Sequence, residues 1–99
     1  MTDNNHQSSH ARLHVFVTGR VQGVFFRAHT KEMAHTFGLS GWVRNLPDGR
    51  VETVYEGKRE VVDAMTAWLH TGPAMASVYS IDIHEEPCTG AEGDFTIRY

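Results

Sequence analysis

The sequence predicts an α+β fold in which two helices pack on one face of a mainly antiparallel sheet. Several short stretches alternate residues with a period of two, which is typical of strands. Two other stretches repeat apolar residues every three or four positions, which is typical of helices. The resulting order is β-α-β-β-α-β with a short C-terminal strand. This order fits the ferredoxin-like α/β sandwich.

The first strand and the first helix are predicted from residues 13–38. Leu13, Val15 and Val17 share one face of a strand, which Gly19 and Gly23 then interrupt. After these glycines one apolar stripe of a helix is formed by Phe26, Thr30, Met33, Ala34 and Phe37. Gly38 follows as the residue that ends this helix.

A hairpin is predicted next. Residues 39–45 and 51–55 are extended, and the turn sequence Leu-Pro-Asp-Gly at 46–49 separates them. The sequence does not determine which side of the second hairpin strand faces the core. Val54 is out of phase with the alternating set Val51, Thr53 and Tyr55.

The rest of the chain supplies a second helix and two strands. The apolar stripe of the helix is formed by Val61, Val62, Met65, Trp68 and Leu69, and Gly72-Pro73 closes it. Residues 77–85 are expected to form a strand with Tyr79, Ile81 and Ile83 on one face, and residues 95–99 a short last strand. Because both helical stripes cover the same sheet face, the other face is expected to be partly open to solvent.

Size and composition limit the class of protein. With 99 residues the chain forms one domain, which we place at residues 11–99 after a polar, flexible tail at residues 1–10. The net charge of −3 argues against a nucleic-acid partner. Cys88 is the single cysteine, no apolar run is long enough to span a membrane, and the start of the chain is too polar for a signal peptide. We therefore expect a cytoplasmic protein without a membrane partner. We also expect a monomer, although no feature of the sequence determines the oligomeric state.

The loop between the first strand and the first helix is the informative segment. Gly19 and Gly23 allow backbone N–H groups to point at a bound anion, and the N-terminus of the following helix presents further N–H groups. Arg27 falls in the first turn of that helix, where a cation has the wrong sign for the helix dipole. This conflict favours an anion site in the loop. The alternative is a solvated arginine in an ordinary strand–helix connection.

Two long motifs identify a family that the sequence resembles. Residues 17–27, VTGRVQGVFFR, resemble the first signature of the acylphosphatases, and residues 41–57, GWVRNLPDGRVETVYEG, resemble the second. The resemblance extends from about Arg12 to Tyr99. It implies hydrolysis of acyl phosphates, which are mixed anhydrides of a carboxylic acid and phosphoric acid, to carboxylate and inorganic phosphate.

The resemblance also implies the roles of individual residues. Arg27 would bind the phosphate, and Asn45 would hold the attacking water. Backbone N–H groups would bind the phosphate oxygens from the loop residues Val21, Gln22, Gly23, Val24, Phe25 and Phe26. We expect inorganic phosphate to inhibit as a product and the substrate's own phosphate oxygen to accept the proton.

This chemistry requires neither a side-chain nucleophile nor a cofactor. An acyl phosphate has a good leaving group, so charge stabilisation and an oriented water are sufficient. An arginine with backbone N–H groups supplies the positive charge that a metal would bring, and no His/Asp/Glu cluster with ligand spacing accompanies the loop. We therefore expect no metal and no cofactor.

Three alternatives stay open. Asn45 can be a turn residue before Leu-Pro-Asp-Gly. The chain can be a non-catalytic regulatory module that binds phosphate or carbamoyl phosphate. Finally, Phe16 and Trp42 could form a stacking platform for RNA on the open sheet face, which the net charge disfavours.

Overall fold

A five-stranded sheet with two helices on one face forms the molecule. The computed structural model describes residues 9–91 and 93–99. The strands are β1 (His10–Arg20), β2 (Ser40–Asn45), β3 (Val51–Lys58), β4 (Ser77–Glu86) and β5 (Phe95–Arg98), and the helices are α2 (Phe26–Phe37) and α3 (Arg59–Thr71).

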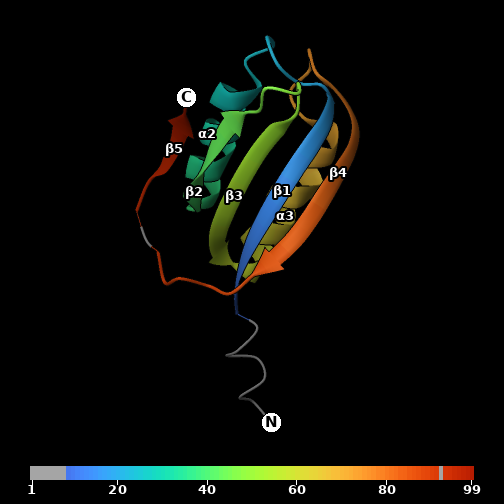
Figure 1. Cartoon of the computed structure of the whole chain (residues 1–99). Helices are drawn as coiled ribbons and strands as arrows, with labels where there is room; N and C mark the ends of the chain where they lie inside the picture. Colours follow the sequence, from blue (N-terminus) through green and yellow to red (C-terminus); the bar gives the residue numbers. More distant parts are fainter. Residues whose placement is uncertain (1–8, 92) are drawn as a thin grey trace.

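The sheet order is β4-β1-β3-β2-β5, and both helices lie behind the sheet in the view of Figure 1. The pairs β1–β3, β1–β4 and β2–β3 are antiparallel, whereas β5 runs parallel to β2. The ferredoxin-like α+β fold is therefore confirmed, with β5 added beside β2 at one edge of the sheet.

Both helices bury the stripes that their spacing predicts. On α2 the buried residues are Phe26, Thr30 and Ala34, and on α3 they are Val62, Met65 and Leu69. The Thr30 hydroxyl is satisfied within the core because it donates to the Phe26 carbonyl at 2.8 Å. Gly38 caps α2 as predicted. The start of α2, and with it Arg27, is thus fixed by the packing of Phe26.

β3 is buried on both faces because it lies at the centre of the sheet. Val51, Thr53 and Tyr55 lie opposite Val17, Val15 and Leu13 of β1, on the face that the helices cover. Val54 points to the other face, where it is also buried. The phase ambiguity in the sequence therefore reflects a strand with two buried faces rather than one.

A bulge between β1 and β4 moves Tyr79 out of the predicted face of β4. Thr18 pairs with Ser80 and Gly19 with Val78, so Tyr79 is an extra residue in the register. The β4 residues that pack against the core are Val78 and Ile81, whereas Tyr79 is 75% and Ile83 45% exposed. The expectation that Tyr79 shares a face with Ile81 and Ile83 is wrong, because the bulge breaks the period of two at Tyr79. Ile81 and Ile83 lie opposite Val17 and Val15 and share one face, as predicted.

The expected tail at residues 1–10 falls mostly outside the described residues. His10 begins β1, and the Ser9 carbonyl accepts a hydrogen bond from the Arg59 N–H at 2.8 Å. In the described part of the chain, neither helix is long and apolar enough to cross a membrane.

Candidate active site

A cleft of about 320 Å³ lies where the β1–α2 loop meets the ends of β2 and β5. The antiparallel hairpin brings the last residue of β2 beside the loop, and the parallel pairing of β5 with β2 carries the end of the chain to the same place (Figure 1). The lining residues are Val21, Gly23, Phe25, Phe26, Arg27, Ala28, Asn45, Ile97 and Tyr99. Six of the eight site residues expected from the sequence are among them.

Arg27 occupies the first turn of α2, as the sequence predicts. No acidic residue accompanies it in that turn, and no carboxylate of the described residues forms an ion pair with it. Its guanidinium carbon lies 4.8 Å from the centroid of the Tyr99 ring. A cation is therefore held at the positive end of a helix dipole beside an aromatic face, without a counter-ion among the described residues.

Asn45 is the last residue of β2 and lines the same cleft. Its Oδ1 is buried and has no hydrogen-bond partner among the residues that the structure describes. A buried acceptor without a partner costs roughly 1–3 kcal/mol, so such an atom calls for an explanation. A donor bound in the cleft, such as a water, would satisfy it.

The loop reaches α2 through two residues in the left-handed region. Gly23 has φ 76°, and Phe25, directly before the helix, has φ 60° and ψ 27°. Left-handed geometry at a bulky residue such as Phe25 is strained, and such strain is often found at functional sites. No side chain caps the helix, so its first N–H groups lack side-chain acceptors and are suited to an anion.

Gly19 serves a different purpose from the one expected. A Cβ there would lie 2.1 Å from the Ser77 carbonyl oxygen, so glycine is required for the close approach of β1 to β4 at the bulge. The glycine of the loop that borders the cleft is Gly23.

Two of the expected residues are not part of the cleft lining. Val24 packs against the hydrophobic core. The Gln22 side chain donates to the carbonyls of Leu46 and Arg50, at 2.8 and 2.9 Å, in the β2–β3 turn.

Ile97 and Tyr99 line the cleft, although the sequence did not predict them as site residues. Their place depends on the parallel register of β5 on β2, in which Val43 lies opposite Ile97. The alternation of Phe95, Ile97 and Tyr99 in the last strand was the available signal. It indicates which residues share a face, but not which edge of the sheet the strand joins.

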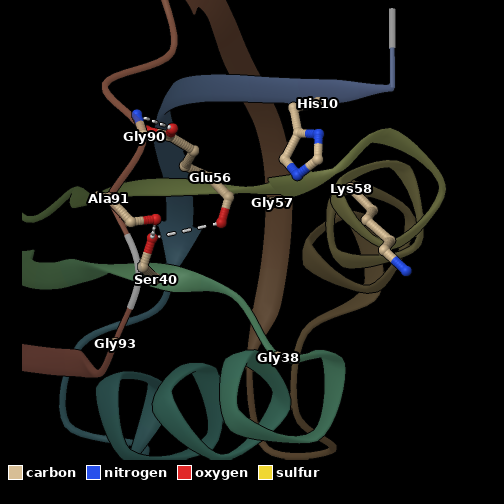
Figure 2. Close-up of a pocket in the computed structure, with 9 residues that line it drawn as sticks. All are labelled: His10, Gly38, Ser40, Glu56, Gly57, Lys58, Gly90, Ala91 and Gly93. Carbon is tan, nitrogen blue, oxygen red and sulfur yellow. Dashed lines mark hydrogen bonds between the residues drawn. The ribbon is translucent and has the colours of Figure 1, made fainter. Parts of the chain in front are cut away.

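A second cleft, of about 290 Å³, lies at the opposite end of β2 and β3 (Figure 2). Glu56 is the buried acid in its lining. Its carboxylate accepts hydrogen bonds from the Thr89 N–H and hydroxyl, the Gly90 N–H and Arg12. Burial alone would raise the pKa of Glu56, but these donors outweigh it and hold the pKa below its usual value. The donors at this end of the molecule therefore already bind Glu56.

Phe16 and Trp42, on the open sheet face, lie beside arginine side chains. The guanidinium of Arg50 lies 5.0 Å from the Phe16 ring centroid, and those of Arg44 and Arg98 lie 5.6 and 4.2 Å from Trp42. Within the described residues, no group of three or more His, Cys, Asp or Glu side chains is placed to hold a metal ion.

Comparison with known proteins gives a consistent result. The family model described as Acylphosphatase matches residues 13–97. Acylphosphatases of Rubrobacter xylanophilus and Syntrophus aciditrophicus are both 53% identical, over 88% and 89% of this chain and 79% and 92% of their own lengths. The structure of an acylphosphatase from Coxiella burnetii superposes with a TM-score of 0.85 at 38% identity, covering 93% of this chain and 96% of that one. The chain therefore belongs to the acylphosphatase family of enzymes.

Proposed function

We propose that this chain hydrolyses acyl phosphates in the cleft formed by the β1–α2 loop, β2 and β5. Arg27 and the backbone N–H groups of residues 21–26 bind the phosphoryl group, and Asn45 orients the attacking water. The observation that supports these roles best is the buried, unpaired Oδ1 of Asn45 in the same cleft as Arg27. Membership of the acylphosphatase family supports the reaction itself.

The reaction proceeds by in-line displacement at phosphorus. The water oxygen attacks phosphorus while the bond from phosphorus to the acyl oxygen breaks, and the bonding pair leaves with the carboxylate. A non-bridging phosphate oxygen takes the proton of the water, so the products are a carboxylate and inorganic phosphate. The Arg27 fork and the N–H groups stabilise charge on the phosphate oxygens and supply the positive charge that a metal would otherwise bring. An assay in excess chelator is therefore expected to show full activity.

Asn45 suits a water rather than a phosphate oxygen. Its amide oxygen accepts a hydrogen bond and its nitrogen donates one, so it orients a water without removing its proton. The acyl part of the substrate would contact the apolar side of the cleft, which includes the exposed ring of Phe25 and the side chain of Ile97.

We also propose a reducing compartment, the cytoplasm, in which the free thiol of Cys88 persists. The chain acts there as a monomer, with inorganic phosphate as product inhibitor and without a nucleic-acid partner. The net charge of −3 supports the last point.

Asn45→Ala tests whether Asn45 acts in catalysis or only stabilises the turn. A catalytic role for Asn45 would also favour an enzyme over a phosphate-binding module. The kcat for a small aryl acyl phosphate should fall by roughly 10²-fold or more, the scale seen when one positioned hydrogen-bonding group is lost. Phosphate affinity, measured as the inhibition constant of inorganic phosphate, should stay near that of the wild type, because Arg27 and the loop are intact.

Asp48→Ala is the matched control in the same hairpin. Asp48 is a turn residue by geometry, because its carboxylate accepts hydrogen bonds from the Arg50 N–H and Nε. This variant should lose up to about 1 kcal/mol of stability and keep its kcat. If Asn45→Ala behaves in the same way, Asn45 is a turn residue as well. If the wild type binds phosphate but releases none from acyl phosphates, the chain is a binding module.

A further inference from the structure

The Gln22 side chain joins the two segments that carry the proposed site. Gln22 lies in the loop between Val21 and Gly23, both of which line the cleft, but its own side chain does not. Its Nε2 donates to Leu46 O at 2.8 Å and to Arg50 O at 2.9 Å. Leu46 directly follows Asn45, so the phosphate-binding loop is attached to the backbone beside the residue that would hold the water.

The two carbonyls that Gln22 contacts also close the turn. Leu46 N–H donates to Arg50 O at 2.8 Å, and Gly49 N–H donates to Leu46 O at 3.1 Å. Each oxygen has a second lone pair, and the two amide hydrogens of Gln22 occupy those sites. Both donors of the side chain are then in use, which leaves neither for a substrate.

We infer that Gln22 is a positioning residue that sets the distance between the bound phosphoryl group and the water held by Asn45. The inference rests on the proposed roles of Arg27 and Asn45. In-line attack requires the water within about 3–3.5 Å of phosphorus and opposite the leaving group, and an error near 1 Å in such a geometry can cost about 10²-fold in rate. Arg27 and Asn45 come from elements that lie apart in the sequence, and the Gln22 bonds tie those elements together.

Gln22→Leu tests the inference because leucine has no donor but a similar volume. Its kcat should fall by roughly 10-fold or more, because the water is displaced from its line to phosphorus. The inhibition constant of inorganic phosphate should change little, because Arg27 and the start of α2 are untouched. Loss of folded protein would also lower the apparent kcat at an unchanged inhibition constant, so kcat is calculated per folded molecule, with the folded fraction measured by circular dichroism.

The double variant Gln22→Leu/Asn45→Ala gives the decisive comparison. If Gln22 acts through Asn45, adding Gln22→Leu to Asn45→Ala should change kcat by less than about twofold, because the water is already lost. If Gln22→Leu lowers kcat by the same roughly 10-fold factor in the wild-type and in the Asn45→Ala backgrounds, the inference is wrong. Gln22→Leu with a normal kcat and a lower thermal midpoint would also overturn it, because the bonds would then be purely structural. If Asn45→Ala alone keeps its kcat, the proposed role of Asn45 fails and the inference fails with it.

Gln22→Glu provides a second variant of the same shape. At neutral pH its carboxylate has no hydrogen to donate and faces two carbonyl oxygens, so it should lose kcat as Gln22→Leu does. Its activity relative to the wild type should rise as the pH is lowered and the carboxyl group gains a proton. A ratio that stays constant with pH would contradict a role for the donated hydrogen bonds.

Ser40→Ala is the matched control at the other end of the sheet (Figure 2). The Ser40 hydroxyl also lies near two backbone carbonyl oxygens, those of Ala91 at 3.2 Å and Glu56 at 3.4 Å. It is comparable in kind but remote from the cleft. Its loss should lower the thermal midpoint and leave kcat unchanged in both the wild-type and the Asn45→Ala backgrounds.

Discussion

Arg27 combines an unfavourable position for folding with a favourable one for binding an anion. A cation at a helix N-terminus costs about 0.3–1 kcal/mol, and the contact with the exposed Tyr99 ring returns about 0.5–1 kcal/mol. The two contributions nearly cancel, so folding alone gives little reason for an arginine at this position. The proposed binding of the phosphoryl group by Arg27 would supply that reason.

Arg27→Ala should therefore separate activity from stability. We expect kcat/KM to fall by roughly 10²–10³-fold and phosphate binding to weaken, because the fork contacts the phosphate before and during the reaction. Arg27→Lys should not restore activity, since a point charge cannot replace a bidentate contact. The unfolding free energy should change by less than about 1 kcal/mol.

Arg20→Ala is the control for Arg27→Ala, because Arg20 is an exposed arginine just before the loop and does not line the cleft. It should keep both activity and phosphate affinity. Turnover of Arg27→Ala close to that of the wild type would remove Arg27 from the mechanism.

At the scale of single elements, the two glycines of the β1–α2 connection make different demands. A methyl group on Gly19 would overlap the Ser77 carbonyl oxygen at 2.1 Å, whereas one on Gly23 would meet nothing within 4 Å. Gly19→Ala should cost roughly 3–5 kcal/mol, because β1 and β4 must separate. Gly23→Ala should cost only about 1 kcal/mol of left-handed strain, but it places a methyl group beside the phosphate loop.

Gly90→Ala measures the cost of left-handed backbone strain alone, without a methyl group beside the β1–α2 loop. Gly90 has the same φ of 76° as Gly23 and equally open surroundings, but it lies at the other end of the molecule. Denaturant unfolding should give similar losses for Gly23→Ala and Gly90→Ala, while phosphate affinity falls in Gly23→Ala alone. Equal phosphate affinity in the two variants would show that the Gly23 backbone does not contact the phosphate.

Periodicity predicted the elements but not how two of the strands are built. The helices, the hairpin and the starting point of α2 follow from local spacing, and local spacing is what a sequence shows directly. The bulge at Tyr79 depends on pairing between β4 and β1, which are separated by about sixty residues in the sequence. The two buried faces of β3 likewise depend on its central place in the sheet.

In the candidate site, too, some residues could be predicted from local sequence, whereas contacts between distant segments could not. The sequence placed Arg27 and Asn45 by their resemblance to two signatures, and the structure brings both to one cleft. The Gln22 contacts and the cleft position of Tyr99 could not be predicted, because each depends on tertiary pairing between distant segments. The residue type and spacing of Gln22 do not indicate by themselves that its side chain positions the segment that contains Asn45.

At the scale of the whole molecule, a charged network crosses the open face of the sheet. Glu52 of β3 accepts a hydrogen bond from Arg44, and Glu86 of β4 accepts one from Arg12. Each of the two carboxylates also forms a hydrogen bond with one ring nitrogen of His14. His14 lies between the two acids, with its ring nitrogens 2.6 Å from Glu52 and 2.9 Å from Glu86. Strands β1, β2, β3 and β4 are thus connected by charge on the face that no helix covers.

This network should make the fold sensitive to acid. Burial would raise the pKa of Glu52, but the bonds from His14 and Arg44 outweigh it and leave the pKa lowered. The bonds from His14 and then Arg12 lower the pKa of Glu86. For each acid the folded pKa lies below the unfolded value of 4.5, so the stabilisation is present above pH 4.5 and is lost as the pH falls through the folded values. The unfolding free energy, measured with denaturant between pH 7 and pH 3, should therefore decrease steadily over the acid part of this range.

Glu52→Gln identifies the source of that loss. At pH 7 the variant should be less stable than the wild type by roughly 1–3 kcal/mol, because charge-assisted bonds to a buried acceptor are weakened. Near pH 3 the difference should shrink, since below pH 4.5 the unfolded wild type binds a proton at Glu52 more readily than the folded protein does. Asp82→Asn, at an exposed position of β4 on the same face, should leave the pH profile parallel to that of the wild type. A constant difference between Glu52→Gln and the wild type from pH 7 to pH 3 would show that the amide disturbs packing, and that ionisation of Glu52 does not control the stability of the sheet.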